Sequence, residues 1–389
     1  MLKKKTANTR ALLTFLKNSH WALILFCLLC SAYGCLLVYS VAMTDESGMR
    51  GVAVQIGASF GGLLLAVLIS RIDYMNLCKL WPVWLGLAGI LVLLTFTPLG
   101  LRVAGTDDTA WLGFPTPDNP LITFQPSELL KIAFIISFSV HLNKVRDSIN
   151  RPLTLLLLCA HGGAAAGSVF LQGDDGTALV FVCIFVCMLF AAGLHPGYLI
   201  AAGGAAICAV PVLLSVLDET KLARIWAIIR VDDYLQSEGW QQATGLSAMG
   251  TGQLWGVGFL EGGDHGLFAR NNDFIFTVAG EEFGFVGSLL LLVLLIGLLG
   301  SILYTACKTQ NFTGRLLCVG MLALIGFQSV INLGMVVRLL PVIGITLPFF
   351  SAGGSSAATL YLGIGLVLSV HYHSKLRSRG GLSFLSPEN

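Results

Sequence analysis

Ten apolar runs, each near the length of a membrane-crossing helix, constrain the fold of this 389-residue chain more than any other feature. A helix needs roughly 20 predominantly apolar residues to cross the hydrocarbon layer of a bilayer. Charged residues make up only 11% of the chain, whereas an ordinary soluble domain carries about 25%. The sequence therefore predicts an all-α, polytopic membrane protein with about ten transmembrane helices. The runs cover residues 22–42, 51–70, 79–97, 127–142, 153–171, 177–194, 198–217, 283–306, 315–336 and 347–370.

The distribution of Lys and Arg predicts the orientation of these helices. With the N-terminus in the cytoplasm, fifteen of the 23 basic residues fall on the inner side and seven on the outer side, with Lys131 near the mouth of a span. Cytoplasmic loops carry an excess of Lys and Arg, so both termini are predicted to be cytoplasmic. We expect one membrane domain over residues 1–389, with cytoplasmic tails at 1–21 and 372–389. A large outer loop is expected at 218–275, between the seventh and eighth helices.

Several other classes of protein do not fit the sequence. The basic residues are scattered and form no patch, so nucleic acid is not an expected partner. The ten cysteines lie within or at the edges of apolar runs, which argues against a disulfide framework. No small-residue cleavage site follows the first apolar run, so this run is predicted to be a retained helix rather than a signal peptide.

Two short motifs place acidic residues at the outer ends of spans. QPSELLK opens the fourth run, and its Glu128 and Lys131 are three residues apart on one helix face, where they can form an ion pair. LQGDDGTA forms the turn before the sixth run, and it contains Asp174 and Asp175. These two acids are either a solvated turn with a helix cap or part of a functional site.

A third acidic motif, ARNNDFIFTVAGEEFGFVG, leads from the large outer loop into the eighth run. The neighbouring phenylalanines would desolvate Asp273 and raise its pKa, whereas Arg270, if close, would lower it. Glu281 and Glu282 are predicted to hold the loop by pairing with Lys131 or Arg224, or by coordinating a cation. The tenth run begins with LPFFSAGGSSA, which is either a broken helix lining a cavity or a tight re-entrant turn.

Four motifs together resemble those of the SEDS family, the RodA/FtsW/SpoVE group of peptidoglycan glycosyltransferases. They are QPSELLK, QGDDGTA, DFIFTVAGEEFGFVG and LPVIGITLPFFSAGGSS, and they occur in this order across the ten runs. The resemblance covers nearly the whole chain. Val54 and Ala110 stand where the family usually has basic residues, and Asp175 is an additional acid. The chain is therefore identified as a divergent member.

The resemblance implies that the protein polymerises lipid II on the outer face of the bacterial cell membrane, in elongation, division or sporulation. Lipid II is a disaccharide–peptide on an undecaprenyl pyrophosphate carrier. Because its leaving group is already a pyrophosphate, one general base and cations for the phosphate charge suffice. Asp273 matches the family's catalytic aspartate. Candidate phosphate contacts are Lys131, Arg224 and Arg338. Other supporting candidates are Glu128, Asp174, Gln241, Glu281, Glu282 and Ser355.

Two alternatives remain at this point: a flippase for the same lipid-linked precursor, and a non-catalytic scaffold of the elongation or division complex. A flippase needs charge in a central cavity, whereas a polymerase needs its base at the outer surface, where the charge rule places Asp273. The resemblance implies a class B penicillin-binding protein, a transpeptidase, as partner, together with other membrane proteins of the complex. The sequence leaves metal dependence open: Asp174, Asp175 or the Glu281/Glu282 pair could hold Mg²⁺ or Mn²⁺, but no spacing demands a metal.

Overall fold

The apolar runs form a bundle of helices, as the sequence predicts. The computed structural model describes residues 17–44, 49–101, 108–114, 122–230, 232–234, 237 and 239–379. Within these ranges, seven helices are long and apolar enough to cross a membrane, and α5 and α9 are shorter apolar helices. The helices that match the ten runs are α2 (Trp21–Thr44), α3 (Arg50–Ser70), α5 (Trp81–Leu94), α6 (Pro126–Lys144), α7 (Pro152–Phe170), α8 (Asp175–Ala192), α9 (Pro196–Val216), α12 (Ile275–Lys308), α13 (Phe312–Val336) and α14 (Gly354–Arg379).

Helix α6 is polar enough to fall below the hydropathy of a lipid-facing span, and the structure shows why this is tolerated. It packs against α5, α7, α8, α13 and α14, so most of its residues, including Glu128 and Lys131, are buried inside the bundle. Polar side chains in a membrane helix usually face the protein interior for this reason. The neighbouring helices therefore shield this short fourth run.

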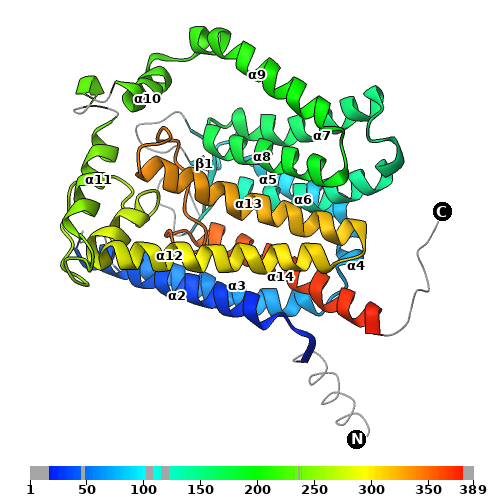
Figure 1. The fold of residues 1–389 in the computed structure, drawn as a ribbon, viewed down its shortest axis with the longest axis horizontal. Coiled ribbons are helices and arrows are strands. Elements are labelled where there is room, and N and C mark those ends of the chain that lie inside the picture. Colours follow the sequence, from blue (N-terminus) through cyan, green and yellow to red (C-terminus); the bar gives the residue numbers. More distant parts are fainter. Residues whose placement is uncertain are drawn as a thin grey trace, which may run out of the picture.

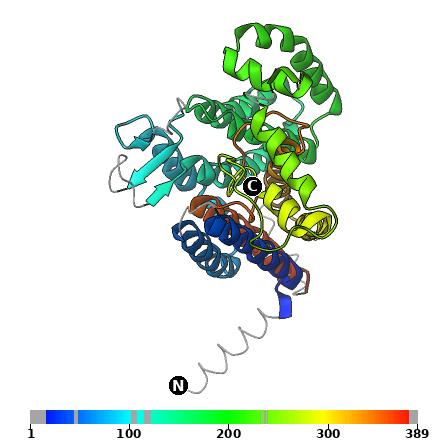
Figure 2. The same ribbon diagram turned by 90° about the vertical axis from the view of Figure 1, so that its left-hand side faces the viewer.

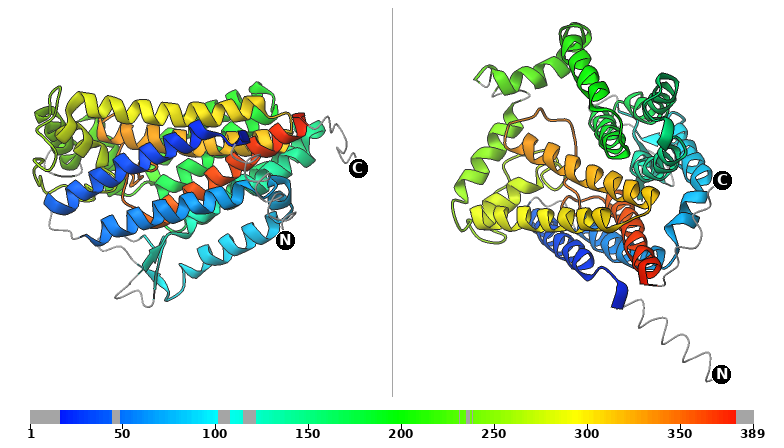
Figure 3. Two further views of the ribbon diagram at one scale, coloured as in Figure 1. Left: turned by 90° about the horizontal axis from the view of Figure 1, so that it is seen from below. Right: turned by 45° about the vertical axis from the view of Figure 1, so that its right-hand side comes forward.

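The long helices are aligned, and the loops gather at the two ends of the bundle. Figure 1 shows α2, α3, α12, α13 and α14 side by side, and α2 packs on α12 while α3 packs on α14. Figure 3 shows the same alignment from below. Helix α2 begins and α14 ends at one end of the bundle, whereas α11 lies at the opposite end (Figure 1). We call the end with α11 the outer end, following the predicted orientation.

The outer end carries the irregular structure. A small antiparallel sheet in the order β1-β2-β3 lies to one side of the bundle (Figure 2), where the sequence predicts only a loop. Its strands are β1 (Gly100–Leu101), β2 (Trp111–Phe114) and β3 (Ile122–Phe124). The large outer loop contains α10 (Glu219–Ile229), η2 (Asp232–Tyr234) and α11 (Trp240–Thr251). Helix α10 is amphipathic. At the inner end lie α4 (Tyr74–Lys79) and η1 (Arg146–Ser148).

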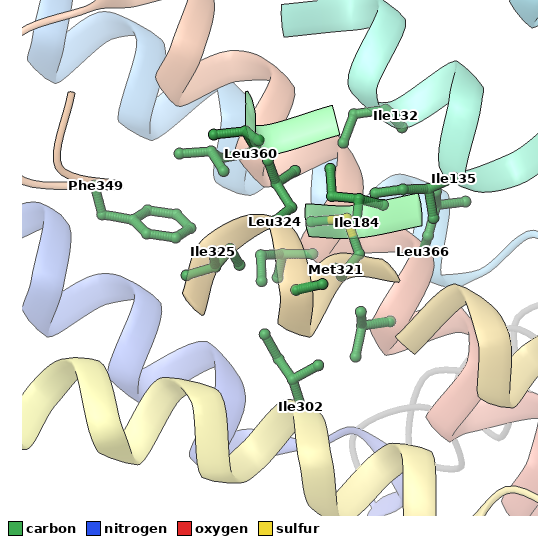
Figure 4. Packing of buried hydrophobic residues seen from close by; sticks show 14 of the residues in the cluster. Ile132, Ile135, Ile184, Ile302, Met321, Leu324, Ile325, Phe349, Leu360 and Leu366 are labelled. Atoms are coloured by element: carbon green, nitrogen blue, oxygen red, sulfur yellow. The ribbon is translucent and has the colours of Figure 1, made fainter. Parts of the chain in front are cut away.

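The centre of the bundle is packed with large aliphatic side chains. Figure 4 shows that Ile132 and Ile135 of α6 meet Met321 and Leu324 of α13, with residues of α8 and α14 around them. In a bilayer, helices associate through close packing because lipid tails are as apolar as the side chains. Small residues permit the closest approaches: Gly365 of α14 lies directly against the backbone of α3. This packing holds α6, α8, α13 and α14 together.

The eighth run begins earlier than predicted, and its predicted start coincides with a break. Helix α12 begins at Ile275, but Gly284 interrupts it with φ 64° and ψ −158°. A left-handed φ is tolerated at glycine because glycine lacks a Cβ atom. The amide N–H of Phe285 donates to the carbonyl of Gln253 at 2.8 Å, and that of Val286 donates to the carbonyl of Leu254 at 3.2 Å. The outer loop thus satisfies amides that the break releases.

The tenth helix begins and ends later than predicted. It starts at Gly354, and 347–353 is non-helical. It continues to Arg379, into the predicted cytoplasmic tail, because Arg377 is anchored at the inner end. The Arg377 guanidinium forms an ion pair with Asp73 at 2.7 Å and donates to the Tyr74 hydroxyl at 3.0 Å.

The orientation is testable by cysteine labelling. In a variant without native cysteines, we expect Ser237→Cys to react with a membrane-impermeant maleimide in intact cells. Ser378→Cys should react only after the cells are permeabilised. Both positions are exposed, so protection reflects the membrane rather than packing. The reverse labelling pattern would invert the topology and place Asp273 in the cytoplasm.

Candidate functional site

Asp273 lies at the outer end, immediately before the first residues of α12. Its backbone carbonyl accepts a hydrogen bond from Asn332 Nδ2 at 2.8 Å, and the same nitrogen donates to the carbonyl of Ile345 at 2.7 Å. The Asp273 carboxylate itself forms no hydrogen bond or ion pair with another described residue. Burial, with a smaller contribution from the negative charge of Asp174, raises the pKa of Asp273 to about 6. The backbone is fixed while the carboxylate keeps its lone pairs free.

The non-helical segment before α14 forms one wall of this site. Ser351 Oγ donates to the carbonyl of Asn272 at 2.6 Å, and the amide of Ala352 donates to the carbonyl of Asn271 at 2.8 Å. Gly344, with φ 69°, faces Asp273: a Cβ atom there would lie 3.9 Å from Asp273 Oδ2. The tenth run thus begins with a non-helical segment and not with a broken helix, since no helix is assigned within 337–353. The backbone of this segment lies against the residues next to Asp273.

Asp174 forms the second acidic position of the site. Its Oδ1 accepts from the amide of Thr177 at 2.8 Å, which caps α8, and its Oδ2 accepts from Gln125 Nε2 at 2.9 Å. Burial raises the pKa of Asp174, and the positive charge of Lys131 opposes this rise. The helix-cap interpretation is thus confirmed, and Asp174 also contributes to the electrostatics of Asp273. Asp175 points elsewhere and forms an ion pair with Lys221 of α10 at 2.5 Å.

Glu128 and Lys131 form the predicted ion pair, with Nζ and Oε1 2.8 Å apart and the two side chains 5% and 2% exposed. Lys131 Nζ also lies 3.5 Å from Gln328 Oε1, and Thr359 Oγ1 donates to Glu128 Oε2 at 3.4 Å. The pair therefore links α6 to both α13 and α14. As a phosphate contact, Lys131 would have to act while it remains bound to Glu128.

The predicted partners of Glu281 and Glu282 are wrong. Glu281 Oε2 pairs with Arg270 Nη2 at 3.2 Å, and its Oε1 lies 2.7 Å from His265 Nε2. Glu282 accepts a hydrogen bond from Ser40 Oγ of α2. Neither glutamate pairs with Lys131 or Arg224, because the break at Gly284 folds the outer loop onto this part of α12. Arg270 is likewise directed to Glu281 and does not lower the pKa of Asp273.

The acidic pairs do not converge as the ligands of one bound cation would. Asp174 and Asp175 face different partners, and Glu281 is neutralised by Arg270. Within the described ranges, no three His, Cys, Asp or Glu side chains gather at metal-binding distance. Oε2 of Glu282 is buried and has no hydrogen-bond partner among the described residues.

Among the described residues, no hydrogen bond or ion pair joins the remaining candidates to Asp273. Arg224 lies half-buried on α10, and the side chains of Gln241 and Ser355 are half-buried; none of the three forms a side-chain hydrogen bond with the described residues. The neighbouring Gln242 is the anchoring residue instead. Its Nε2 donates to the carbonyls of Met335 and Leu340 at 2.6 and 2.8 Å, and it thereby ties α11 to the end of α13.

Sequence reasoning missed the amide side chains that build the site. Gln328 and Asn332 lie in the apolar run 315–336, four residues apart on one face of α13. Gln328 Nε2 donates to Thr346 Oγ1 at 3.2 Å, while Asn332 holds the backbone of Asp273. A polar pair at helical spacing inside a membrane helix is the signal that could have identified them.

The fold and the site together define a class: a polytopic membrane protein with a free, half-buried carboxylate at the outer end of its bundle. Comparison with known proteins then gives the family. The model of the FtsW/RodA/SpoVE family of cell cycle proteins matches residues 20–376. The chain belongs to this family, and the family predicted from the motifs is confirmed.

Curated relatives and solved structures agree with this assignment. The chain is 31% identical over 329 residues to a probable peptidoglycan glycosyltransferase FtsW of Geobacter metallireducens, covering 81% of this chain and 83% of that protein. It is 29% identical to the peptidoglycan glycosyltransferase MrdB of Escherichia coli K12, covering 92% of this chain and 94% of that protein.

Two solved structures share the fold. A chain from a peptidoglycan synthase complex, studied for its coordination of polymerization and crosslinking, superposes with a TM-score of 0.76 at 27% identity, covering 91% of this chain and 98% of that one. The rod shape determining protein RodA of Thermus thermophilus gives a TM-score of 0.66 at 28% identity, covering 90% of this chain and 96% of that one.

Proposed function

We propose that this protein is a peptidoglycan glycosyltransferase that polymerises lipid II at the outer face of the bacterial cell membrane, with Asp273 as general base. The observation that carries the proposal is the Asp273 carboxylate: it is free of partners among the described residues, and its pKa is raised to about 6. An effective general base has a pKa near the working pH. The family relationship and the names of the curated relatives support the same activity.

The reaction needs few protein groups. The acceptor hydroxyl oxygen attacks the anomeric carbon of the donor sugar, the bond from that carbon to the pyrophosphate breaks, and the hydroxyl proton passes to Asp273. The Asn332 bond to its backbone fixes the base, because a displacement of about 1 Å is enough to cost a large factor in rate. The departing pyrophosphate carries its own negative charge, so a second carboxylic acid is not needed.

The proposal includes a partner, a class B penicillin-binding protein that crosslinks the new glycan, within a larger elongation or division complex. Support comes from the similarity to the chain of the peptidoglycan synthase complex. The direct test is polymerisation of lipid II by the purified protein, with and without its cognate transpeptidase. Glycan strands of increasing length are expected. A protein that only moves lipid II across vesicles, without forming glycan, would be a flippase, and one that does neither would be a scaffold.

The raised pKa of Asp273 predicts a pH profile. The base must be ionised to accept a proton, so kcat/KM should be constant well above the pKa of about 6 and fall about tenfold per pH unit below it. Polymerisation rates at low lipid II concentration, measured from pH 5 to 8, would show this limb. A flat profile across that range would argue against Asp273 as the base.

A further inference from the structure

Arg338 adopts an unusual backbone conformation in the turn after α13. Its φ is 61°, in the left-handed region that glycine occupies readily and residues with a Cβ atom avoid. The turn around it is fixed from several sides. The carbonyl of Gly334 accepts from the amides of Leu339 and Leu340 at 2.7 and 3.0 Å, and Gln242 holds the carbonyl of Leu340. With the hydrogen bond from the amide of Arg338 to the carbonyl of Met335 at 3.2 Å, these bonds form a common left-handed helix end, where glycine is the preferred residue. Arg338 therefore occupies a position that favours glycine.

The Arg338 side chain is also incompletely satisfied. It is half-buried, and its Nη2 is fully buried with no hydrogen-bond partner among the described residues. A buried N–H group without an acceptor is unfavourable, more so on a charged group. Two unfavourable features thus coincide at one residue. The helix end accounts for the backbone conformation, so the unpaired nitrogen is the feature that indicates a ligand. The chemical complement of a guanidinium is an oxyanion.

The position of Arg338 relates it to the catalytic site. Asn332, near the end of α13, holds the backbone of Asp273. Helix α13 ends at Val336, and Arg338 lies in the turn that follows at the outer end. A lipid-linked disaccharide–peptide with its reacting hydroxyl at Asp273 would extend past this level.

We propose that Arg338 is a substrate-binding residue that receives an oxyanion of the lipid-linked substrate. The inference rests on the proposed function and deepens it. A guanidinium binds phosphate and carboxylate oxygens alike, often through two parallel hydrogen bonds. The substrate offers both chemistries, in its diphosphate and in the carboxylates of its peptide stem. Binding would satisfy Nη2 and would explain why an arginine occupies a position suited to glycine.

Three substitutions separate this role from a structural one. Arg338→Gly removes the guanidinium but relieves the backbone strain, so its melting temperature in detergent should equal or exceed that of the wild type. Its kcat/KM for lipid II should nevertheless fall by on the order of 10-fold to 100-fold, as expected for the loss of charged hydrogen bonds. Arg338→Ala should lose similar activity without the gain in stability, and Arg338→Lys should recover part of the activity.

Two controls and two substrates complete the experiment. Leu339→Ala alters an exposed neighbour in the same turn, and Arg315→Ala removes a cation at the inner end; both should leave kcat/KM unchanged. Lipid II is then compared with an analogue that lacks the peptide. If the Arg338→Gly defect persists on the analogue, the diphosphate is the bound group; if it disappears, a stem carboxylate is.

The inference and the proposed function fail in different ways. Wild-type activity in Arg338→Gly on lipid II would overturn the binding role. The binding role would also be overturned if the activity lost in each variant were proportional to the fall in its melting temperature. Absence of polymerisation by the wild-type protein would overturn the proposed function instead.

Discussion

Asp273→Asn is expected to abolish lipid II polymerisation, with a loss on the order of 10²–10⁴ in rate, the usual contribution of a general base. Asparagine keeps the shape and polarity of the side chain but cannot accept the proton. Folding should be preserved, because the structural role of this position is carried by the backbone carbonyl, which Asn332 binds. The melting temperature should not fall, since burial already disfavours the charged form of Asp273.

Matched variants sharpen this experiment. Asp273→Glu should retain little activity, since one methylene displaces the carboxylate by about 1 Å or more. Asp264→Asn provides the control: this exposed acid lies in the same loop and accepts a hydrogen bond from the amide of Gly266, a role that asparagine can fill. Its activity should equal that of the wild type. Wild-type polymerisation by Asp273→Asn would refute the catalytic role, and transpeptidase binding should be unaffected in either case.

The second large effect is expected at the buried ion pair of α6. Glu128→Gln or Lys131→Met leaves the partner as an unpaired charge inside the bundle, where both side chains are almost fully buried. Breaking a buried pair by removing one member typically costs about 3–5 kcal/mol. We therefore expect each single variant to show a large loss of folded protein in the membrane and a lower melting temperature in detergent.

The double variant tests the interpretation. With both charges removed, no unpaired charge remains, so Glu128→Gln/Lys131→Met should be more stable than either single variant. The measurement is a double-mutant cycle on membrane protein level and melting temperature. Additive effects, or silent single variants, would contradict a coupled buried pair. If the double variant folds but does not polymerise lipid II, Lys131 also contributes to substrate binding.

Local rules of sequence predicted much of the molecule. Helix positions followed from the apolar runs because a bilayer admits few alternatives to helices. The Glu128–Lys131 pair followed from a three-residue spacing on one helix. The predicted start of the eighth helix, residue 283, lies next to the break in α12 at Gly284. These features depend on residues close together in the chain.

Partners distant in sequence could not be predicted in this way. Glu281 was expected to meet Lys131 or Arg224, yet it binds Arg270 and His265, because the outer loop folds back over the break in α12. The amides of Gln328 and Asn332 were overlooked, since a polar residue in an apolar run does not indicate which backbone it faces. The left-handed turn at Arg338 also contacts Gln242, which lies almost a hundred residues earlier.

The sequence by itself determined the class of protein, its helices, its family and the identity of the acid at position 273. The tertiary structure alone decided that this carboxylate is free while the neighbouring acids are paired. The physical reason is that the pKa and the reactivity of an acid depend on its desolvation and on the charges around it. Those surroundings come from the starts of α6, α8 and α12 and the segment before α14, which only the packed bundle brings together.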